Sequence, residues 1–300
     1  MKTTRILPLL LLLPALQAFA DTPIQLQHAA TPTVLVSISN IAGAVHVTAW
    51  DRNQVQVGGT LGYGAKPLAI TGSDDHLSIK VEAQGNGSWF DWGNSSRMGS
   101  TTLDVHVPRG ASLKVDVVSA SLSVDGTRGG RLKLDSISGR LRIDAQTPFL
   151  DVNSVSGNIA FAGQADAAHL QTVSGDILAS SLGRDANLQT VSGQIQASGG
   201  PWQHFKLSTV SGDAGITGSL LAGGSIGIDS MSGDVDLALP ANLSATIHAS
   251  TFSGDLHSDF GKPVSSGYGP GTTLQATVGG GHGSIDVDTF SGDLRLRRQD

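Results

Sequence analysis

Short runs of alternating apolar and polar residues fill most of the chain, as in Leu188-Gln-Thr-Val191 and Gln194-Ile-Gln-Ala197. A period of two, with many Val, Ile and Thr residues, is typical of β-strands. A Ser-Gly pair separates the two strands of a unit, and about seven looser residues lead to the next unit. The pattern therefore predicts an all-β protein built from short repeated units.

The repeat has the form small, apolar, Ser, Gly, polar, apolar, and it occurs eight times. Its glycines are separated by 18, 18, 18, 19, 21, 21 and 38 residues. They are Gly139, Gly157, Gly175, Gly193, Gly212, Gly233, Gly254 and Gly292. The last interval equals two periods, so we expect one unit between Gly254 and Gly292 that has lost the motif. A degenerate copy with Ala120 at the glycine position precedes the series, and a fainter one spans Asn40 to Val45.

Two architectures fit units of 18–21 residues. In a β-solenoid of about ten coils, the Ser-Gly pair is a corner and the coils stack into one parallel core. In an antiparallel meander, the same pair is a two-residue hairpin turn. We favour the solenoid, because a unit this short cannot bury an apolar face alone whereas stacked coils build a continuous core.

Stacking places equivalent residues of successive coils in columns. We expect two apolar columns in the core and a hydrogen-bonded hydroxyl stack at the corner. The first column is Val155, Val173, Val191, Val210, Met231 and Phe252, and the second is Ile159, Ile177, Ile195, Val235 and Leu256. The hydroxyl stack is Ser138, Ser156, Ser174, Ser192, Ser211, Ser232, Ser253 and Ser291.

Composition agrees with a strand-rich chain. The 300 residues include 39 Gly, no Cys and 25 acidic residues, of which 24 are Asp and one is Glu. Since Glu favours helices and Asp does not, few ordinary helices are expected. A hydrophobic content of 39% argues against disorder. Without Cys, neither disulfides nor thiol chemistry enter the picture.

The first twenty residues have the features of a signal peptide. Lys2 and Arg5 precede an apolar stretch over residues 6–16, and Ala18-Phe19-Ala20 offers small residues to a signal peptidase. Cleavage before Asp21 would leave 17 basic and 25 acidic residues, a net charge of −8. That charge disfavours nucleic acid and anionic membranes as partners. We expect an exported bacterial protein, periplasmic or extracellular, without an integral membrane segment after cleavage.

The domain organisation follows from these patterns. Residues 1–20 form the signal peptide, and residues 21–300 form one strand-repeat domain. Within this domain we expect degenerate N-terminal strands over 33–107 and regular repeats over 113–297.

The repeat resembles the bacterial "putative adhesin" β-strand-repeat family, domain-of-unknown-function family 4097. Residues 41–51 look like its opening strand pair, with a Gly corner and a Trp-Asp turn. Residues 103–113 look like its strand, Pro, Gly, strand junction, and residues 239–245 and 281–294 look like its closing units. The resemblance covers residues 33–297 and implies an adhesin-like architecture. The family brings no established activity or catalytic residues.

The acidic residues after the corner glycines are the first candidates for chemistry. They are Asp176, Asp213, Asp234, Asp255 and Asp293. Stacked carboxylates could share a cation or act on a polysaccharide. The simpler interpretation is structural, with each Asp capping backbone N–H groups at the corner. Asn158 and Gln194 at the same position in other units favour that interpretation. We predict no catalytic, cofactor-binding or metal-binding residues.

One insertion, residues 85–99, concentrates aromatic residues between Gly, Asn and Ser. Trp89, Phe90 and Trp92 could contact a sugar or a protein partner, or could fold back and cover an open end of the solenoid. These residues are the possible contact surface that the sequence predicts.

Two functions from different classes remain. The first is a non-enzymatic envelope protein whose solenoid is a binding or scaffolding surface for an envelope protein or glycan. End-to-end self-association of the rod is a further option for its partner. The second is a secreted polysaccharide-active β-helix enzyme that uses the Asp column.

Overall fold

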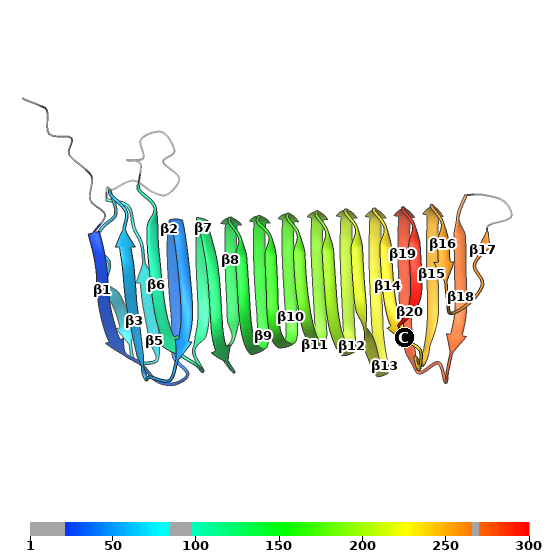
Figure 1. Ribbon diagram of the computed structural model, residues 1–300, viewed down its shortest axis with the longest axis horizontal. Helices are drawn as coiled ribbons and strands as arrows, with labels where there is room; N and C mark the ends of the chain where they lie inside the picture. Colours follow the sequence, from blue (N-terminus) through cyan, green and yellow to red (C-terminus); the bar gives the residue numbers. More distant parts are fainter. Residues whose placement is uncertain (1–21, 85–97, 266–269, 300) are drawn as a thin grey trace, which may run out of the picture.

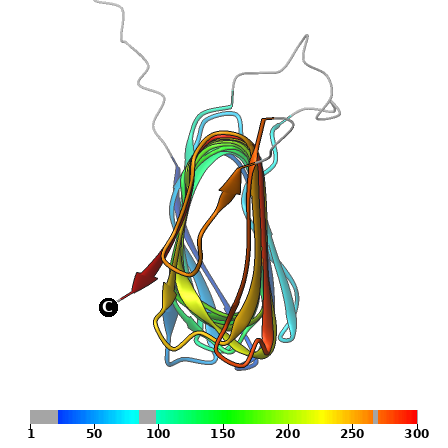
Figure 2. The same cartoon turned by 90° about the vertical axis from the view of Figure 1, so that its right-hand side faces the viewer.

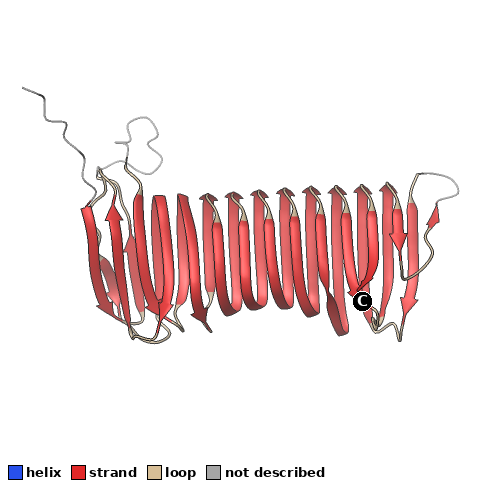
Figure 3. Ribbon diagram, viewed as in Figure 1, coloured by secondary structure: helices blue, strands red, loops and turns tan. Residues whose placement is uncertain are grey.

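The computed structural model describes residues 22–84, 98–265 and 270–299, which form twenty β-strands (Figure 3). No described residue is helical, so this part of the chain contains no helix that could cross a membrane. The strands are β1 (Thr22–Ala29), β2 (Leu35–Trp50), β3 (Gln54–Leu61), β4 (Ile70–Ser73), β5 (His76–Lys80), β6 (Thr101–Pro108), β7 (Ser112–Arg128), β8 (Leu132–Ser138), β9 (Leu141–Ser156), β10 (Ile159–Ser174), β11 (Ile177–Ser192), β12 (Ile195–Ser211), β13 (Ala214–Ser232), β14 (Val235–Pro240), β15 (Ala245–Ser253), β16 (Leu256–Ser258), β17 (Val264–Ser265), β18 (Thr272–Val278), β19 (Gly283–Ser291) and β20 (Leu294–Gln299).

The coils stack side by side into a rod that is oval when viewed along its axis (Figures 1 and 2). Each long strand bends around the rod and belongs to two sheets. We call the segments that lead into the Ser-Gly pairs, such as 185–192 of β11, the front sheet. The segments that follow the pairs, such as 177–182, form the back sheet.

Adjacent coils pair in parallel and in register. Between β10 and β11, Ile159 lies opposite Ile177 and Leu170 lies opposite Leu188, an offset of one repeat. The same pattern continues from β11 to β12 and from β12 to β13. This pairing confirms the predicted β-solenoid, and an antiparallel meander of the repeats is excluded.

The core consists of inward-facing columns contributed by the two sheets. The predicted column of Ile159, Ile177, Ile195, Val235 and Leu256 lies inside, and each of its members is at most 7% exposed. In the front sheet, a second column contains Leu170, Leu188, Leu207 and Ile228. Burying each such side chain contributes about 1.5–3 kcal/mol, so every added coil extends the stabilised core.

At the C-terminal end, the order of coils in space differs from their order in the chain. β13 pairs with β19, and β19 pairs in turn with β15. On the back sheet, β20 lies between β14 and β16. The coil formed by β19 and β20 is therefore inserted between two coils that precede it in the sequence, as Figure 1 shows in red between yellow and orange.

This insertion corrects the expectation of a lost repeat between Gly254 and Gly292. The two glycines lie in adjacent coils, since Ser253 is in register with Ser291. The intervening chain runs outward, forms β17 and β18, and returns. Because all coils carry nearly the same motif, spacing along the sequence could not reveal which coils are neighbours.

The N-terminal end has a similar arrangement. β2 pairs with β7 on its inner side and with β5 and β6 on its outer side. Antiparallel strands then close both ends of the rod. At the N-terminal end β3 pairs with β6, β1 pairs with β3, and β4 pairs with β5, and at the C-terminal end β18 pairs with β15.

Candidate functional site

The corner of each regular repeat needs glycine at the fourth position of the motif, directly after the serine. Gly193 and Gly212 have φ angles of 144° and 141°, in the region that favours glycine. A Cβ atom on either would lie 2.0 Å from the carbonyl oxygen of the corner glycine in the preceding coil. The corners therefore stack backbone against backbone, with no room for a side chain.

The acidic residues beside these glycines cap the backbone of neighbouring coils. The Asp234 N–H donates to Oδ1 of Asp213 at 2.9 Å, and the Asp293 N–H donates to Oδ1 of Asp234 at 2.8 Å. Asp176 accepts from the Gln194 N–H at 3.0 Å in the same way. One oxygen of each of these carboxylates is thus engaged in holding the stack together, as the structural interpretation of this row predicts.

The corner serines stack in register, but their hydroxyls do not form the expected hydrogen-bonded column. Among the described residues, no hydrogen bond joins one of these hydroxyls to the next. The backbone makes the connection instead, as where Gly193 N–H donates to the carbonyl of Ser211 at 3.1 Å.

The structure contradicts the prediction that the apolar residues preceding the Ser-Gly pairs lie in the core. Val191 is 48% exposed, whereas its neighbour Thr190 is buried. Strand alternation explains the difference, because Leu188 points inward, so Thr190 points inward and Val191 points outward. Their apolar character led to the prediction that they are buried, whereas the alternation of side chains along the strand places them on the outside.

These exposed residues form a column through ten successive coils of the rod, with one residue in each coil. We call this column the apolar ladder. In spatial order it contains Ile41, Val118, Ile137, Val155, Val173, Val191, Val210, Met231, Phe290 and Phe252. With strands about 4.8 Å apart, the ladder is about 43 Å long.

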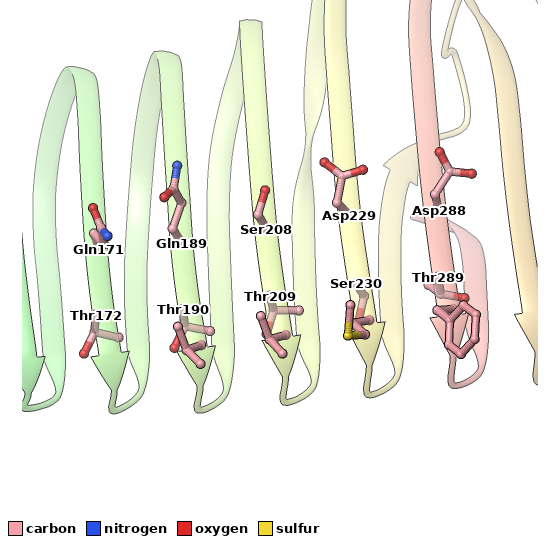
Figure 4. A pocket seen from close by; sticks show the side chains of 14 residues that line it. Gln171, Thr172, Gln189, Thr190, Ser208, Thr209, Asp229, Ser230, Asp288 and Thr289 are labelled. Carbon is pink, nitrogen blue, oxygen red and sulfur yellow. The ribbon is translucent and has the colours of Figure 1, made fainter.

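A shallow groove follows the apolar ladder across the front sheet. It consists of two hollows of about 1060 and 610 Å³, both of which Gln171 lines. A polar row borders the ladder on its sheet side, and Figure 4 shows part of it, from Gln171 through Ser208 to Asp229 and Asp288. Figure 4 also shows a row of buried Ser and Thr residues, such as Thr190. In the sequence, each of them stands between a residue of the polar row and a residue of the ladder.

The C-terminal part of the groove carries the bulkiest apolar surface and the most negative charge. The Phe252 and Phe290 rings stack with centroids 4.9 Å apart and an interplanar angle of 9°. Both rings are about half exposed, and Met231 precedes them in the ladder. The carboxylates of Asp229 and Asp288 lie on one side of this stretch, and the corner row of Asp residues lies on the other.

The N-terminal part of the groove contains charges of both signs. Nζ of Lys66 and Nζ of Lys80 lie 3.1 and 2.8 Å from the Glu82 carboxylate. Hydrogen bonds from Lys80 and Lys66 hold the pKa of Glu82 below its ordinary value. Nζ of Lys133 donates to Asp151 at 2.9 Å, a bond that raises the lysine pKa, and lies 3.8 Å from Asp135, which lines the groove. Lysines therefore pair with carboxylates in this half of the groove, whereas no Lys or Arg is among the described residues that line the C-terminal hollow.

The predicted aromatic contact residues Trp89, Phe90 and Trp92 lie outside the described residues. Within the described ranges, no group of three or more His, Asp or Glu side chains is arranged to hold a metal ion. The apolar ladder is the candidate binding surface that sequence reasoning missed.

The chain belongs to the Toastrack DUF4097 family, whose model matches residues 36–297. No curated protein matches the sequence.

Among solved structures, the chain is similar to a "putative adhesin" from Bacteroides fragilis NCTC 9343, with 12% identity and a TM-score of 0.45, over 93% of this chain and 98% of that one. A "putative adhesin" from Parabacteroides distasonis ATCC 8503 shares 13% identity, with a TM-score of 0.45, over 92% and 97% of the two chains. A "putative cell adhesion protein" from Clostridium sporogenes ATCC 15579 shares 10% identity, with a TM-score of 0.24, over 93% and 100%. At these values the likenesses carry no inference about ligands.

Proposed function

We propose that this protein is an exported, non-enzymatic envelope protein, an adhesin-like β-solenoid whose front-sheet groove is a binding or scaffolding surface. The observation that carries the proposal is the apolar ladder, which leaves ten adjacent apolar side chains in solvent along a groove. Monomeric proteins seldom expose a long contiguous apolar patch unless it contacts something.

The repeated geometry suits a surface that contacts an elongated partner. Equivalent side chains recur once per coil at a fixed spacing, so a partner lying along the rod meets the same kind of contact at each coil. Repeated contacts along one rigid surface act together, so their combined affinity exceeds that of any single contact. The expected partner is an envelope protein or glycan.

One feature supports a non-enzymatic role. The corner carboxylates of Asp176, Asp213 and Asp234 each accept a backbone N–H from the next coil, which is a structural task. Purified protein should therefore release no reducing sugar from acidic polysaccharides, with or without calcium. Turnover in that assay would instead support the polysaccharide-active enzyme.

Export is supported by the N-terminal sequence, in which Lys2 and Arg5 precede an apolar stretch and an Ala-Phe-Ala site. The test is cell fractionation with N-terminal sequencing of the recovered protein. We expect a chain that begins at Asp21 in the periplasmic or extracellular fraction. An unprocessed chain in the cytoplasm would contradict the proposal.

The binding surface is tested with a triple variant, Val173→Ser, Val191→Ser and Val210→Ser, in the middle of the apolar ladder. The matched control is Leu178→Ser, which changes a side chain 59% exposed on the back sheet. We expect the triple variant to lose binding to isolated envelopes and the control to keep it. Equal binding by both would show that the groove is not the binding surface.

A further inference from the structure

We infer that the C-terminal half of the groove binds a cationic amphipathic α-helix, with one apolar side chain per turn and Lys or Arg on both flanks. This inference rests on the proposed function and names the chemistry of its partner. The binding strip runs along the ladder from Val173 to Phe252. It spans six coils, or about 24 Å, which matches the length of about 16 helical residues.

The charge around this strip points to a basic partner. On the corner side, the row reads Asp176, Gln194, Asp213, Asp234, Asp293 and Asp255, with no basic residue. On the sheet side, the row reads Gln171, Gln189, Ser208, Asp229, Asp288 and Ser250. The strip thus has carboxylates along its corner side and, at its C-terminal end, Asp229 and Asp288 on its sheet side, which complements an apolar stripe with basic residues on both sides.

Few cations of the protein itself neutralise these rows. Arg295 reaches Asp293 at 3.4 Å from the back sheet. Lys206 lies on the front sheet, one outward position farther from the ladder than Ser208. Asp288 accepts a hydrogen bond from the Ser250 hydroxyl at 2.5 Å, and this contact leaves its charge uncompensated. Asp213 and Asp234 each use one carboxylate oxygen to accept a backbone N–H, and their second oxygens, together with Asp229, remain for basic side chains of a partner.

The spacing of the ladder favours a helix over an extended peptide. A helix presents one side chain per turn every 5.4 Å, which differs from the coil spacing by about 0.6 Å. An extended peptide presents same-face side chains about 6.7 Å apart, so it falls out of step by about 1.9 Å at each coil. Over the five intervals of the strip a helix lying along the rod accumulates about 3 Å of mismatch and an extended peptide about 9.5 Å, so the helix stays much closer to the spacing of the ladder.

A second copy of this chain fits the strip less well. If two such strips met face to face with their coils in the same order, acidic rows would oppose acidic rows. Like charges in contact oppose association. The stacked pair of Phe252 and Phe290 with Met231 next to it offers the widest apolar area of the ladder. This is where we place the anchoring side chain of the helix.

The test uses the full chain and a synthetic peptide of about 18 residues. The peptide carries Leu once per turn, Lys on both sides of the Leu stripe and Ala elsewhere, with a fluorescent label. We expect saturable binding by fluorescence anisotropy, a gain of helical circular dichroism on binding, and weaker binding at high salt. A scrambled peptide of the same composition, without the stripe, should bind at least about tenfold more weakly.

Variants locate the contact. Phe252→Ser with Phe290→Ser should weaken binding at least about tenfold, and Asp229→Asn with Asp288→Asn should reduce its salt dependence. Leu178→Ser on the back sheet should bind like the wild type. All these side chains face outward, so circular dichroism should show unchanged folding.

Three results would overturn the inference. They are equal binding of the scrambled peptide, wild-type affinity in the double Phe variant, and a dimer in sedimentation equilibrium that the double Phe variant abolishes. The last result would assign the strip to a second copy. If the peptide fails but the Val triple variant still loses envelope binding, only this inference fails. If that variant also binds envelopes normally, the proposed function fails with it.

Discussion

Substituting Gly193 by Ala tests whether the close packing of corners holds the solenoid together. The residue has a φ angle of 144°, and its Cβ would lie 2.0 Å from the carbonyl oxygen of Gly175. The substitution therefore creates two problems, an unfavourable backbone conformation and a collision with the backbone of the neighbouring coil.

The magnitude can be worked out from both parts. A non-glycine residue in this φ region costs about 1–3 kcal/mol. Restoring an ordinary contact means moving the coils of Gly175 and Gly193 apart by about 1 Å, which disrupts the bond from Gly175 N–H to Ser192 O, worth about 0.5–1.5 kcal/mol. We expect Gly193→Ala to lower the free energy of unfolding by about 2–4 kcal/mol.

Alanine substitutions at two other glycines separate the cost of the backbone conformation from the cost of the collision. Gly223 has a φ angle of 78° and open space where a Cβ would lie, so Gly223→Ala should show the conformational cost alone, about 1–2 kcal/mol. Gly227 has open space and no such φ angle, so Gly227→Ala should stabilise the protein by about 0.4–1 kcal/mol.

Urea denaturation followed by circular dichroism measures all three variants. The predicted order of stability is Gly227→Ala, wild type, Gly223→Ala and Gly193→Ala. If Gly193→Ala is no less stable than Gly223→Ala, the close approach of the corners does not constrain the fold and the reasoning is refuted.

Three further predictions concern the core, the corner row and the groove. Leu188→Ala should lower the free energy of unfolding by about 2.7–5 kcal/mol, whereas Val191→Ala, three residues away but outward-facing, should change it by less than about 0.5 kcal/mol in thermal or urea denaturation. Asp234→Ala removes the acceptor for Asp293 N–H and should cost about 1 kcal/mol, while Asp234→Asn should retain most of the stability; similar losses in both would contradict the capping role. In an NMR titration, the pKa of Glu82 should lie below its ordinary value of 4.5. Because the pKa is lowered in the folded protein, the stability that Glu82 contributes is present above 4.5 and is lost as the pH falls through the folded pKa. Glu82→Gln should remove this pH dependence.

The periodic Ser-Gly spacing, together with the shortness of each unit, favoured a parallel solenoid over an antiparallel meander, and the structure confirms the solenoid. Strand alternation and glycine corners are local properties, and each coil repeats them, so the fold class and the inward column of Ile159 and Ile177 followed from the sequence. Burial of the other column was predicted wrongly, because valine before a Ser-Gly pair looks like a core residue. Counting in twos from Leu188 gives the outward direction of Val191.

The candidate site was less accessible to sequence reasoning. Phe290 and Phe252 are 38 positions apart in the chain, yet their rings stack. That neighbour relation depends on the insertion of β19 and β20, and no residue in the repeated motif encodes it. The acidic rows could be read from the sequence, but their position on either side of an exposed strip required the direction of each side chain.

The inserted coil also makes the groove depend on a complete molecule. During synthesis β15, β16 and β18 emerge before β19 and β20, so an unfinished chain lacks the coil that lies between Met231 and Phe252 in the complete structure. Phe290 joins the ladder only when the later segment has been made. A chain truncated before Gly283 would lack the middle of its most apolar stretch, even though all the flanking coils are present. The structure therefore ties display of the full strip to the integrity of residues 283–299, and a copy that has lost these residues lacks Phe290 from its ladder.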